Sequence, residues 1–405
     1  MKPQSSLGDH RSSSSHGGNQ VTVGQYNERL VISLLRRHIW LTKAELARRT
    51  GLSAQTMTVI VKRLMENGLL IQGDKQRGRV GQPSTPFGLN PRGAVSIGIK
   101  IGRRSLDLIA MGFDGSVIER RTERFAIPEA ETTMALIRSR LPEMIAALPA
   151  DLRARLLGAG IAMPRTMSGW EDEMNLPAGA LAGWSDIDVA AEIEALVKAP
   201  TYLLHDVSAA CLGELCFGIG KNIQNFFYIY VGSFVGGGLV LSNQLQTGAH
   251  GSAASIGSLP TGLHMESNAA QLIEKASLTG FEAMARAAGH DDPHAFYYGE
   301  QNESTRALFS QWALNAADSL AFAVTVTAAV LDLDAVVIAG GLPHDRVAEL
   351  VEKTHARLPL YNTKGLHLPQ IYQAEIGIEA RAIGGAFAPI YTHFSLERNR
   401  LLIEG

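Results

Sequence analysis

The segment from Thr42 to Leu70 constrains the fold of this chain more than any other. Its apolar residues recur at helical spacing in two short runs, and Gly51 stands between them, where a tight turn can use its conformational freedom. Ser53 comes directly before the second run, and its hydroxyl is placed to cap the first turn of a helix. Ala47 is small enough to let the two helices pack closely. The segment therefore predicts a helix–turn–helix, a motif whose second helix can enter the major groove of DNA.

The second predicted helix has two different faces. Its apolar residues repeat as on the buried face of an amphipathic helix, and they are Met57, Ile60, Val61, Leu64 and Met65. Its other face carries hydroxyl, amide and basic groups, which can bind base edges and phosphates. The candidate DNA-binding residues are Lys43, Ser53, Gln55, Thr56, Thr58, Lys62 and Arg63, with Arg77, Arg79 and Gln82 in the loop that follows.

A further helix and a wing are predicted on either side of this motif. An apolar stripe indicates a helix from Asn27 to about His38, and short apolar runs at 69–71 and 86–89 indicate two strands. The loop between the strands is rich in Gly, Arg and Lys. Arg77 and Arg79 in this loop can therefore reach the phosphate backbone or a narrow minor groove.

Charge is distributed unevenly along the chain. Residues 26–92 contain twelve Lys and Arg against four Asp and Glu, although the whole chain carries a formal net charge of −2. A basic segment on an acidic remainder is typical of a nucleic-acid-binding module attached to another domain. Helix–turn–helix patterns also arise by chance, and a basic helix can be a solvated face or bind only proteins. The coincidence of turn spacing, periodicity, charge and a basic wing favours DNA binding.

Length and composition limit the remaining possibilities. With 405 residues, 46% of them hydrophobic, the chain is expected to form two or three soluble domains. Its two cysteines, Cys211 and Cys216, predict neither a disulfide framework nor a metal cluster, which fits a reducing cytoplasm. The apolar run 321–331 is too short to span a bilayer and predicts a buried helix. Residues 1–24 are rich in Ser and Gly and lack the apolar core of a signal peptide, which predicts a disordered tail.

The chain from about Gly93 onward has the pattern of an α/β protein. Short apolar runs end in glycine-containing turns and alternate with helical segments, as in lobes that bind nucleotides or sugars. Three strands are expected between residues 95 and 125, and the glycines at 236–238 are expected to follow a strand as its turn. Other strands are expected at 156–162, 201–204, 225–231 and 335–339, and helices at 132–147 and 207–215.

Several motifs of this body, taken together, resemble the ROK family of repressors, unassigned reading frames and sugar kinases. They are SIGIKIGRRSLDLIAMGFDG, GIAMPRTMSGW, LAGWSDIDV, HDVSAACLGE, YVGSFVGGGLVLSNQLQTGAHGSAASIGSLP, VVIAGGLP and RAIGGAFAPIY. The resemblance implies an α/β, actin-like sugar-kinase body with a ligand cleft between two lobes, preceded by a winged helix–turn–helix head that is all-α apart from its wing. It also implies that members with such a head regulate transcription, commonly as repressors of carbohydrate genes, and form dimers or tetramers.

The implied organisation has three parts. They are the tail at 1–24, the winged helix–turn–helix domain at 25–92 and the ligand-sensing, oligomerising body at 93–405. The small lobe of the body is expected at about 93–204 together with a C-terminal helix at 377–400, and the large lobe at about 205–376.

The two turns that hold ATP phosphates in kinases of this family are altered here. The first resembles D-x-G-x-T, but Lys100 replaces the acid that would organise Mg²⁺. The second resembles G-T-G-x-G-G-G, but Phe234 puts a large side chain where the backbone should approach phosphate. Both changes argue against phosphoryl transfer, so no catalytic residue and no cofactor is expected.

The sugar-binding positions that the resemblance implies are altered as well. The family's Asn-Asp pair is His205-Asp206, the Asn before L-x-G-W is Ala180, and the G-E-x-G-H segment reads ASIGS at 254–258. The cysteines of the family's zinc loop are missing there, so no metal is expected. The candidate ligand-binding residues are His205, Asp206, His250, Ser255 and Ser258.

Each of these residues has a structural alternative. Asp206 could cap the helix that follows it, His205 could simply end a strand, and His250 could instead be a packed core residue. Lys100 and Arg103 could form an anion site, but we expect them to be surface charges on a degenerate turn.

Two functions remain on this evidence. The first is a DNA-binding transcriptional regulator, a repressor of carbohydrate uptake or catabolism genes, with a non-catalytic effector domain. The second is an ATP-dependent sugar kinase with an appended DNA-binding module, and the turn at Lys100 favours the regulator. The expected partners are a double-stranded DNA operator, a sugar or sugar-derivative effector and further copies of the chain in a homodimer or homotetramer. No membrane partner is expected, and the expected location is the cytoplasm.

Overall fold

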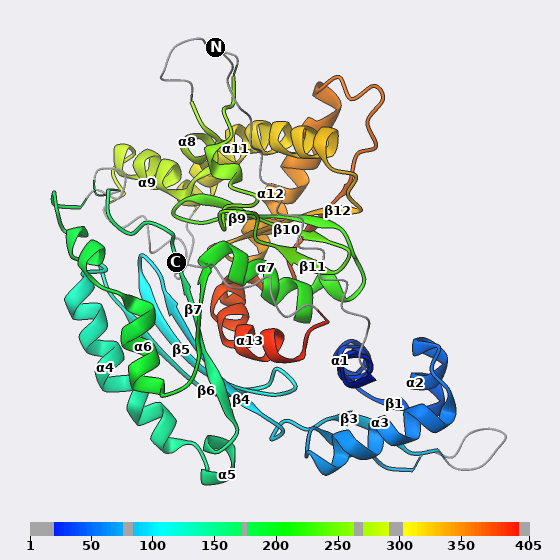
Figure 1. Ribbon diagram of the computed structural model, residues 1–405. Helices are drawn as coiled ribbons and strands as arrows, with labels where there is room; N and C mark the ends of the chain where they lie inside the picture. The colour runs from blue at the N-terminus through cyan, green and yellow to red at the C-terminus, as the bar shows by residue number, and fades with distance from the viewer. Residues whose placement is uncertain are drawn as a thin grey trace, which may run out of the picture.

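The head of the molecule, residues 20–92, is a winged helix (Figure 1). The computed structural model describes residues 20–75, 84–169, 171, 176–262, 270–290 and 303–396. The elements of the head are α1 (Gln20–His38), β1 (Leu41–Thr42), α2 (Lys43–Thr50), α3 (Ala54–Glu66), β2 (Leu70–Gln72) and β3 (Pro86–Leu89). The strands form an antiparallel sheet in the order β1-β3-β2. The predicted helix–turn–helix and both wing strands are confirmed.

Two features of the head differ from the prediction. Helix α1 begins at Gln20 instead of Asn27, because its first turns contain Gly24 and expose Val23 and Tyr26, so no buried apolar stripe marks them. Strand β1 has only two residues, too few for an alternating pattern to reveal it.

Local capping fixes the geometry of α2 and α3. Gly51 has a φ of 70°, in the left-handed region that favours glycine. The Ser53 hydroxyl accepts a hydrogen bond from the Thr56 amide, as predicted for an N-cap. Thr42 and Glu45 form a capping box at the start of α2. Each of these bonds joins residues close in sequence, which is why the motif could be predicted.

The first sheet of the body has the strand order β6-β5-β4-β7-β8. Its strands are β4 (Val95–Ile101), β5 (Ser105–Gly112), β6 (Val117–Arg124), β7 (Leu156–Met163) and β8 (Thr201–His205). Strands β4, β5 and β6 are antiparallel, whereas β7 and β8 run parallel to β4. Its outer face packs against α4 (Ala130–Ala147) and α6 (Val189–Val197), and α5 (Ala150–Arg153) follows α4.

The second sheet has the order β11-β10-β9-β12-β13. Its strands are β9 (Phe226–Val231), β10 (Val235–Leu241), β11 (Gln244–Gln246), β12 (Ala335–Gly340) and β13 (Gln370–Gln373). Its outer face packs against α8 (Leu272–Ala276), α9 (Leu278–Ala287), α11 (Glu303–Val330) and α12 (His344–Arg357). Short 3-10 turns lie at Ala182–Asp186, Ile219–Lys221, Ile256–Ser258, Leu358–Leu360 and Gly377–Glu379. The predicted two-lobed α/β architecture is confirmed.

Helices α7 (Asp206–Phe217) and α13 (Ala380–Phe394) lie between the two body sheets and pack on each other (Figure 1). Helix α7 contacts β10, and α13 contacts β4 and β7. A Cβ atom at Gly384 would lie 1.6 Å from the carbonyl oxygen of Ala209, so this helix pair requires a glycine at that point. The RAIGGAF motif is therefore a packing motif that lets α13 enter between the lobes.

The glycines at 236–238 lie inside β10, and the prediction that they form a turn is wrong. A Cβ atom at Gly238 would lie 2.5 Å from the Cβ of Cys211 on α7. The glycines thus allow β10 to lie directly against α7. Glycine marks both turns and close backbone approaches, and only the packed structure distinguishes the two.

Helix α11 is, among the described helices, the one long and apolar enough to cross a membrane by length and composition. Phe309, Trp312 and Leu320 of this helix are buried in the core of the second lobe. The helix is therefore part of the folded body, as the prediction of a buried helix at 321–331 requires.

Candidate nucleic-acid interface and ligand cleft

The exposed face of α3 carries most of the candidate DNA-binding residues. Met57, Ile60, Val61 and Leu64 are buried in the core of the head and Met65 is half-buried, which confirms the predicted apolar face. Figure 1 shows α2 and α3 at the periphery of the molecule. The exposed candidates are Ser53, Gln55, Thr56, Thr58, Lys62 and Arg63.

Several of these side chains are already engaged within the head. The Thr58 hydroxyl donates to the carbonyl of Ala54 at 2.9 Å, and the hydroxyls of Thr56 and Ser53 are 2.9 Å apart. Arg63 forms an ion pair with Glu28, which fastens α1 to α3. Gln55 is exposed and has no side-chain partner among the described residues, so its amide is left available for an external hydrogen bond.

The other candidates of the head lie nearer to the wing. The Lys43 ammonium lies 5.5 Å from the centre of the Phe87 ring on β3. Arg77, Arg79 and Gln82 fall outside the described residues. Val59 is not among the predicted DNA-binding residues, because its side chain cannot form a hydrogen bond, yet it is 61% exposed on α3. An apolar residue that lies off the buried stripe of a predicted recognition helix indicates a candidate base contact, because such a side chain can contact a thymine methyl group.

A cavity of about 590 Å³ lies between the two lobes. Its walls are the inner face of β4, β5 and β6, the turn between β9 and β10, and the first residues of α7 and α13. This is the cleft that the sequence predicts, and its wall is unusually rich in charged side chains.

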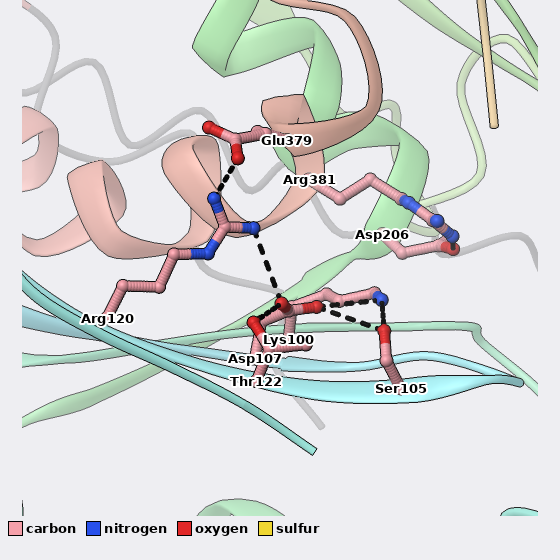
Figure 2. Close-up of polar contacts among 8 residues, drawn as sticks. All are labelled: Lys100, Ser105, Asp107, Arg120, Thr122, Asp206, Glu379 and Arg381. Atoms are coloured by element: carbon pink, nitrogen blue, oxygen red, sulfur yellow. Dashed lines mark hydrogen bonds and ion pairs between the residues drawn. The ribbon is translucent and has the colours of Figure 1, made fainter. Parts of the chain in front are cut away.

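Lys100 lies on the cleft side of β4 and is only 6% exposed. Its ammonium donates to Asp107 at 3.0 Å and to Ser105 at 2.6 Å (Figure 2). The neighbours Ile99 and Ile101 point into the core of the first lobe, so strand alternation turns Lys100 to the opposite face. The expectation that Lys100 is a surface charge is wrong. Burial and the nearby Arg381 lower its pKa to about 8, against the opposing effect of Asp107.

A chain of polar contacts joins this sheet face to the start of α13 (Figure 2). Asp107 accepts a hydrogen bond from Thr122 at 2.6 Å and lies 3.4 Å from Arg120. Arg120 also pairs with Glu379, directly before α13. These contacts link residues of β5 and β6 directly to the start of α13.

Asp206 begins α7 and is 7% exposed. Its carboxylate accepts a hydrogen bond from the Val207 amide at 2.9 Å and pairs with Arg381 at 3.3 Å. The N-cap position itself belongs to His205, so the capping alternative is wrong in detail, although the Asp206 carboxylate does bind an amide of the first turn. Burial alone would raise the pKa of Asp206, but His205, Arg381 and Arg103 together hold it below its usual value.

The two altered phosphate turns meet across the cleft. The Arg103 guanidinium of the first lobe lies 4.4 Å from the centre of the Phe234 ring of the second lobe. Its Nη2 donates to the carbonyl of Thr166 at 3.4 Å, and burial lowers the pKa of Arg103 to about 10. The expectation that Arg103 is a free surface charge is therefore wrong, because it packs against the opposite lobe.

The candidate ligand residues do not all gather in the cleft. His205, Asp206 and Ser258 line it. His250 and Ser255 are exposed and are not among the lining residues, so the core-packing alternative for His250 is wrong. The loop lies beside the cleft without lining it: the His250 carbonyl accepts from Arg165, a lining residue, and the Ser255 hydroxyl donates to the Ser252 carbonyl.

Fold and site together define a class of protein: a winged-helix head carried by a two-lobed α/β body with a charged cleft. The model of the ROK family matches residues 96–388, and that of the MarR family matches residues 25–79. The chain belongs to the ROK family.

Three similar proteins span different parts of the chain. The uncharacterized protein y4fQ of Sinorhizobium fredii is 24% identical over 91% of both chains. The xylose repressor of Bacillus subtilis is 22% identical, over 59% of this chain and 61% of its own length. A crystal structure of a ROK family transcriptional regulator, a homologue of the E. coli MLC protein, superimposes with a TM-score of 0.63. That match has 16% identity and covers 92% of this chain and 98% of the regulator.

Proposed function

We propose that this protein is a transcriptional repressor whose affinity for an operator depends on a sugar-derived molecule bound in the cleft. The observation that best supports this proposal is that the head contacts both lobes of the body. Arg37 of α1 donates to the Asn243 side chain of the second lobe at 2.5 Å. Arg155 of the first lobe donates to the carbonyl of Asn67, at the end of α3, at 3.2 Å. A change in the angle between the lobes must break one of these contacts or move the head.

Helix α13 supplies a second connection between cleft and head. Arg381 at its start lines the cleft, and Phe387, six residues later and roughly 9 Å along the helix, contacts α1. The Arg36 guanidinium lies 4.4 Å from the Phe387 ring and 5.6 Å from the Phe113 ring, and it donates to the Phe113 carbonyl at 3.0 Å. Burial lowers the pKa of Arg36 to about 10, so the guanidinium stays charged between the two rings at neutral pH.

The head and the body also share one hydrophobic core. Val31, Ile32 and Leu35 of α1 belong to the same buried cluster as Met111 of β5 and Ile390 of α13. A head on a flexible tether would not have such a core, so the docked head supports mechanical coupling to the body.

On DNA, two copies of the chain would place their α3 helices in successive major grooves of an inverted repeat, with half-sites one or two helical turns apart. Ligand-driven lobe movement would change the spacing of the two heads and so weaken the operator complex. The protein would act in the cytoplasm on genes for carbohydrate uptake or catabolism, by analogy with the xylose repressor that it resembles.

The cleft residues argue against phosphoryl transfer. Lys100 occupies the position of the acid that would organise Mg²⁺. Asp206, the residue at the position of the family's general base, is buried and paired with Arg381, and its lowered pKa makes it a weak base. An ATPase and hexose kinase assay tests this directly, and turnover that disappears in Asp206→Asn would overturn the assignment.

Genomic-fragment selection with the purified full chain, followed by footprinting across a salt series, tests operator binding. A protected inverted repeat supports the proposal, whereas only weak, salt-sensitive binding counts against it. Arg37→Ala should change operator affinity by no more than about threefold, because one partly exposed hydrogen bond contributes little free energy. It should nevertheless reduce the response to the effector, because the contact between the head and the second lobe is lost. Asn243→Ala removes the same bond from the other side, and an unchanged response in both variants would disprove the coupling.

A further inference from the structure

We infer that the cleft takes an anionic sugar derivative, whose phosphate or carboxylate group is bound by Arg103 and Arg381. This inference rests on the proposed function and specifies the chemistry of its effector. Both arginines line the same cavity, Arg103 from the turn between β4 and β5 and Arg381 from the first turn of α13.

The cleft wall has more positive than negative side chains. Among the described lining residues seven are Lys or Arg, and four are Asp or Glu. Four of the cations have carboxylate partners in the wall: Lys100 and Arg120 share Asp107, Arg104 pairs with Glu282, and Arg381 pairs with Asp206. Arg103 instead has an aromatic ring and a backbone carbonyl as its partners. A neutral sugar would leave Arg103 without an anionic partner, whereas an oxyanion would supply one.

Two guanidinium N–H groups in the wall are buried and have no hydrogen-bond acceptor among the described residues. They are the Nε atoms of Arg103 and Arg381. Buried N–H groups are almost always hydrogen-bonded, so two such donors in one cavity mark a place where a ligand supplies the acceptors. Guanidinium groups bind phosphate and carboxylate through two parallel hydrogen bonds, a geometry that an ammonium lacks.

Both guanidinium groups are held in place before any ligand arrives. Arg103 stacks on Phe234, and Arg381 is fixed by Asp206 and lies 4.7 Å from the centre of the Tyr230 ring. Their charges also act on a common neighbour, since both arginines lower the pKa of Asp206. Donors that are already fixed lose little freedom on binding, which favours a specific oxyanion over a mobile counterion.

The size and polarity of the cavity point to a ligand larger than the anion itself. A volume of about 590 Å³ is far above what one phosphate group fills, and it lies in the range of small-molecule sites. His205 and Ser258 on the wall of the second lobe can meet sugar hydroxyls while the arginines hold the anionic group.

Calorimetric titration of the full chain with four probes tests this inference. The probes are glucose 6-phosphate, glucuronate, glucose and inorganic phosphate. We expect the phosphate ester or the carboxylate to bind at least about tenfold more tightly than glucose, and inorganic phosphate to compete with it. Glucose binding as tightly as both anionic probes, or no competition by phosphate, would overturn the inference. A separate titration with ATP tests for a nucleotide site, and ATP binding more tightly than the sugar anions would also overturn the inference.

Variants separate a specific contact from net charge and from misfolding. Arg103→Gln should lower affinity for the anionic probe about tenfold. Arg103→Lys should recover only part of that affinity, because an ammonium restores the positive charge but not the two parallel donors of the guanidinium. Arg121→Gln is the matched control: Arg121 is on β6 beside cleft residues but pairs with Glu119 and Glu143 on the opposite face. Equal losses in Arg103→Gln and Arg121→Gln would refute a specific contact. Far-ultraviolet circular dichroism and operator footprinting confirm that each variant is folded.

The outcomes distinguish this inference from the proposed function. If the protein bound its operator and only neutral glucose released it from the DNA, the proposed function would be supported and the anion site would be refuted. A protein that binds glucose 6-phosphate but no operator would do the reverse.

Discussion

The ion pairs of the head and those of the cleft join the same types of side chain but differ in their exposure to solvent. In the head, Arg63 and Glu28 are 50% and 18% exposed, and Lys62 and Glu66 are 75% and 62% exposed. In the cleft, Lys100 and Asp107 are 8% and 7% exposed. Exposed pairs exchange a partner at little cost, so the head can give its cations to DNA phosphates. Buried pairs are costly to break, so the cleft holds its charges in fixed positions for one type of ligand.

The largest expected effect is the removal of Asp107. Asp107→Ala leaves Lys100 and Arg120 without their shared carboxylate, and we expect it to lower the free energy of unfolding by about 3–5 kcal/mol. Urea denaturation followed by circular dichroism measures this change. The double variant Lys100→Met with Asp107→Leu removes both buried charges and should cost less than Asp107→Ala alone. If Asp107→Ala lowered the free energy of unfolding by less than about 1 kcal/mol, as expected for an exposed ion pair, the contrast between the cleft and the head would be wrong.

The next effect concerns the free amide on α3. Gln55→Ala should weaken operator binding by about 1–3 kcal/mol if the amide reads a base, with no change in the salt dependence. Fluorescence anisotropy over a range of salt concentrations measures both quantities. Lys62→Ala is the comparison, because it should weaken binding to all sequences alike and reduce the salt slope by about one. If Gln55→Ala also behaves in this way, Gln55 binds the backbone and not a base.

The third effect is a pH dependence of anion binding. Lys100 faces Asp107 from β5, Asp206 from α7 and Arg381 from α13, and its pKa is lowered to about 8. Below this pH the ammonium is charged and favours the anion, and above it the charge is lost. We therefore expect affinity for an anionic probe to fall by several-fold between roughly pH 7 and 9. Lys100→Met should remove this dependence, and an identical pH profile in the variant would rule Lys100 out as its source.

The smallest effect is expected at the exposed pair of the head. Glu28→Gln should change the free energy of unfolding by at most about 1 kcal/mol, because Arg63 is half exposed and water replaces its partner. Operator affinity should be unchanged or slightly higher, since Arg63 is then free to approach phosphate. A loss comparable to that of Asp107→Ala would mean that this pair is needed to hold α1 against α3.

The sequence predicted the parts of the fold that are specified locally. Gly51 and Ser53 act within one turn of their own positions, and the apolar stripe of α3 repeats every three or four residues. The order of strands and helices in the body and the membership of the ROK family were also accessible, because the motifs that carry them are contiguous. Lys100 and Phe234 were recognised as departures from the family pattern for the same reason.

Tertiary structure decided the surroundings of those residues. Lys100 is buried because α13, about 280 residues later in the chain, covers its strand face, and Arg103 meets Phe234 only because the two lobes close on each other. His250 and Ser255 stand close to Ser258 in sequence, but only Ser258 lines the cleft. The sequence by itself determined local geometry and the types of side chain at each position. Burial, charge pairing and the link from cleft to head depend on contacts between distant segments, and these exist only once the whole chain has packed.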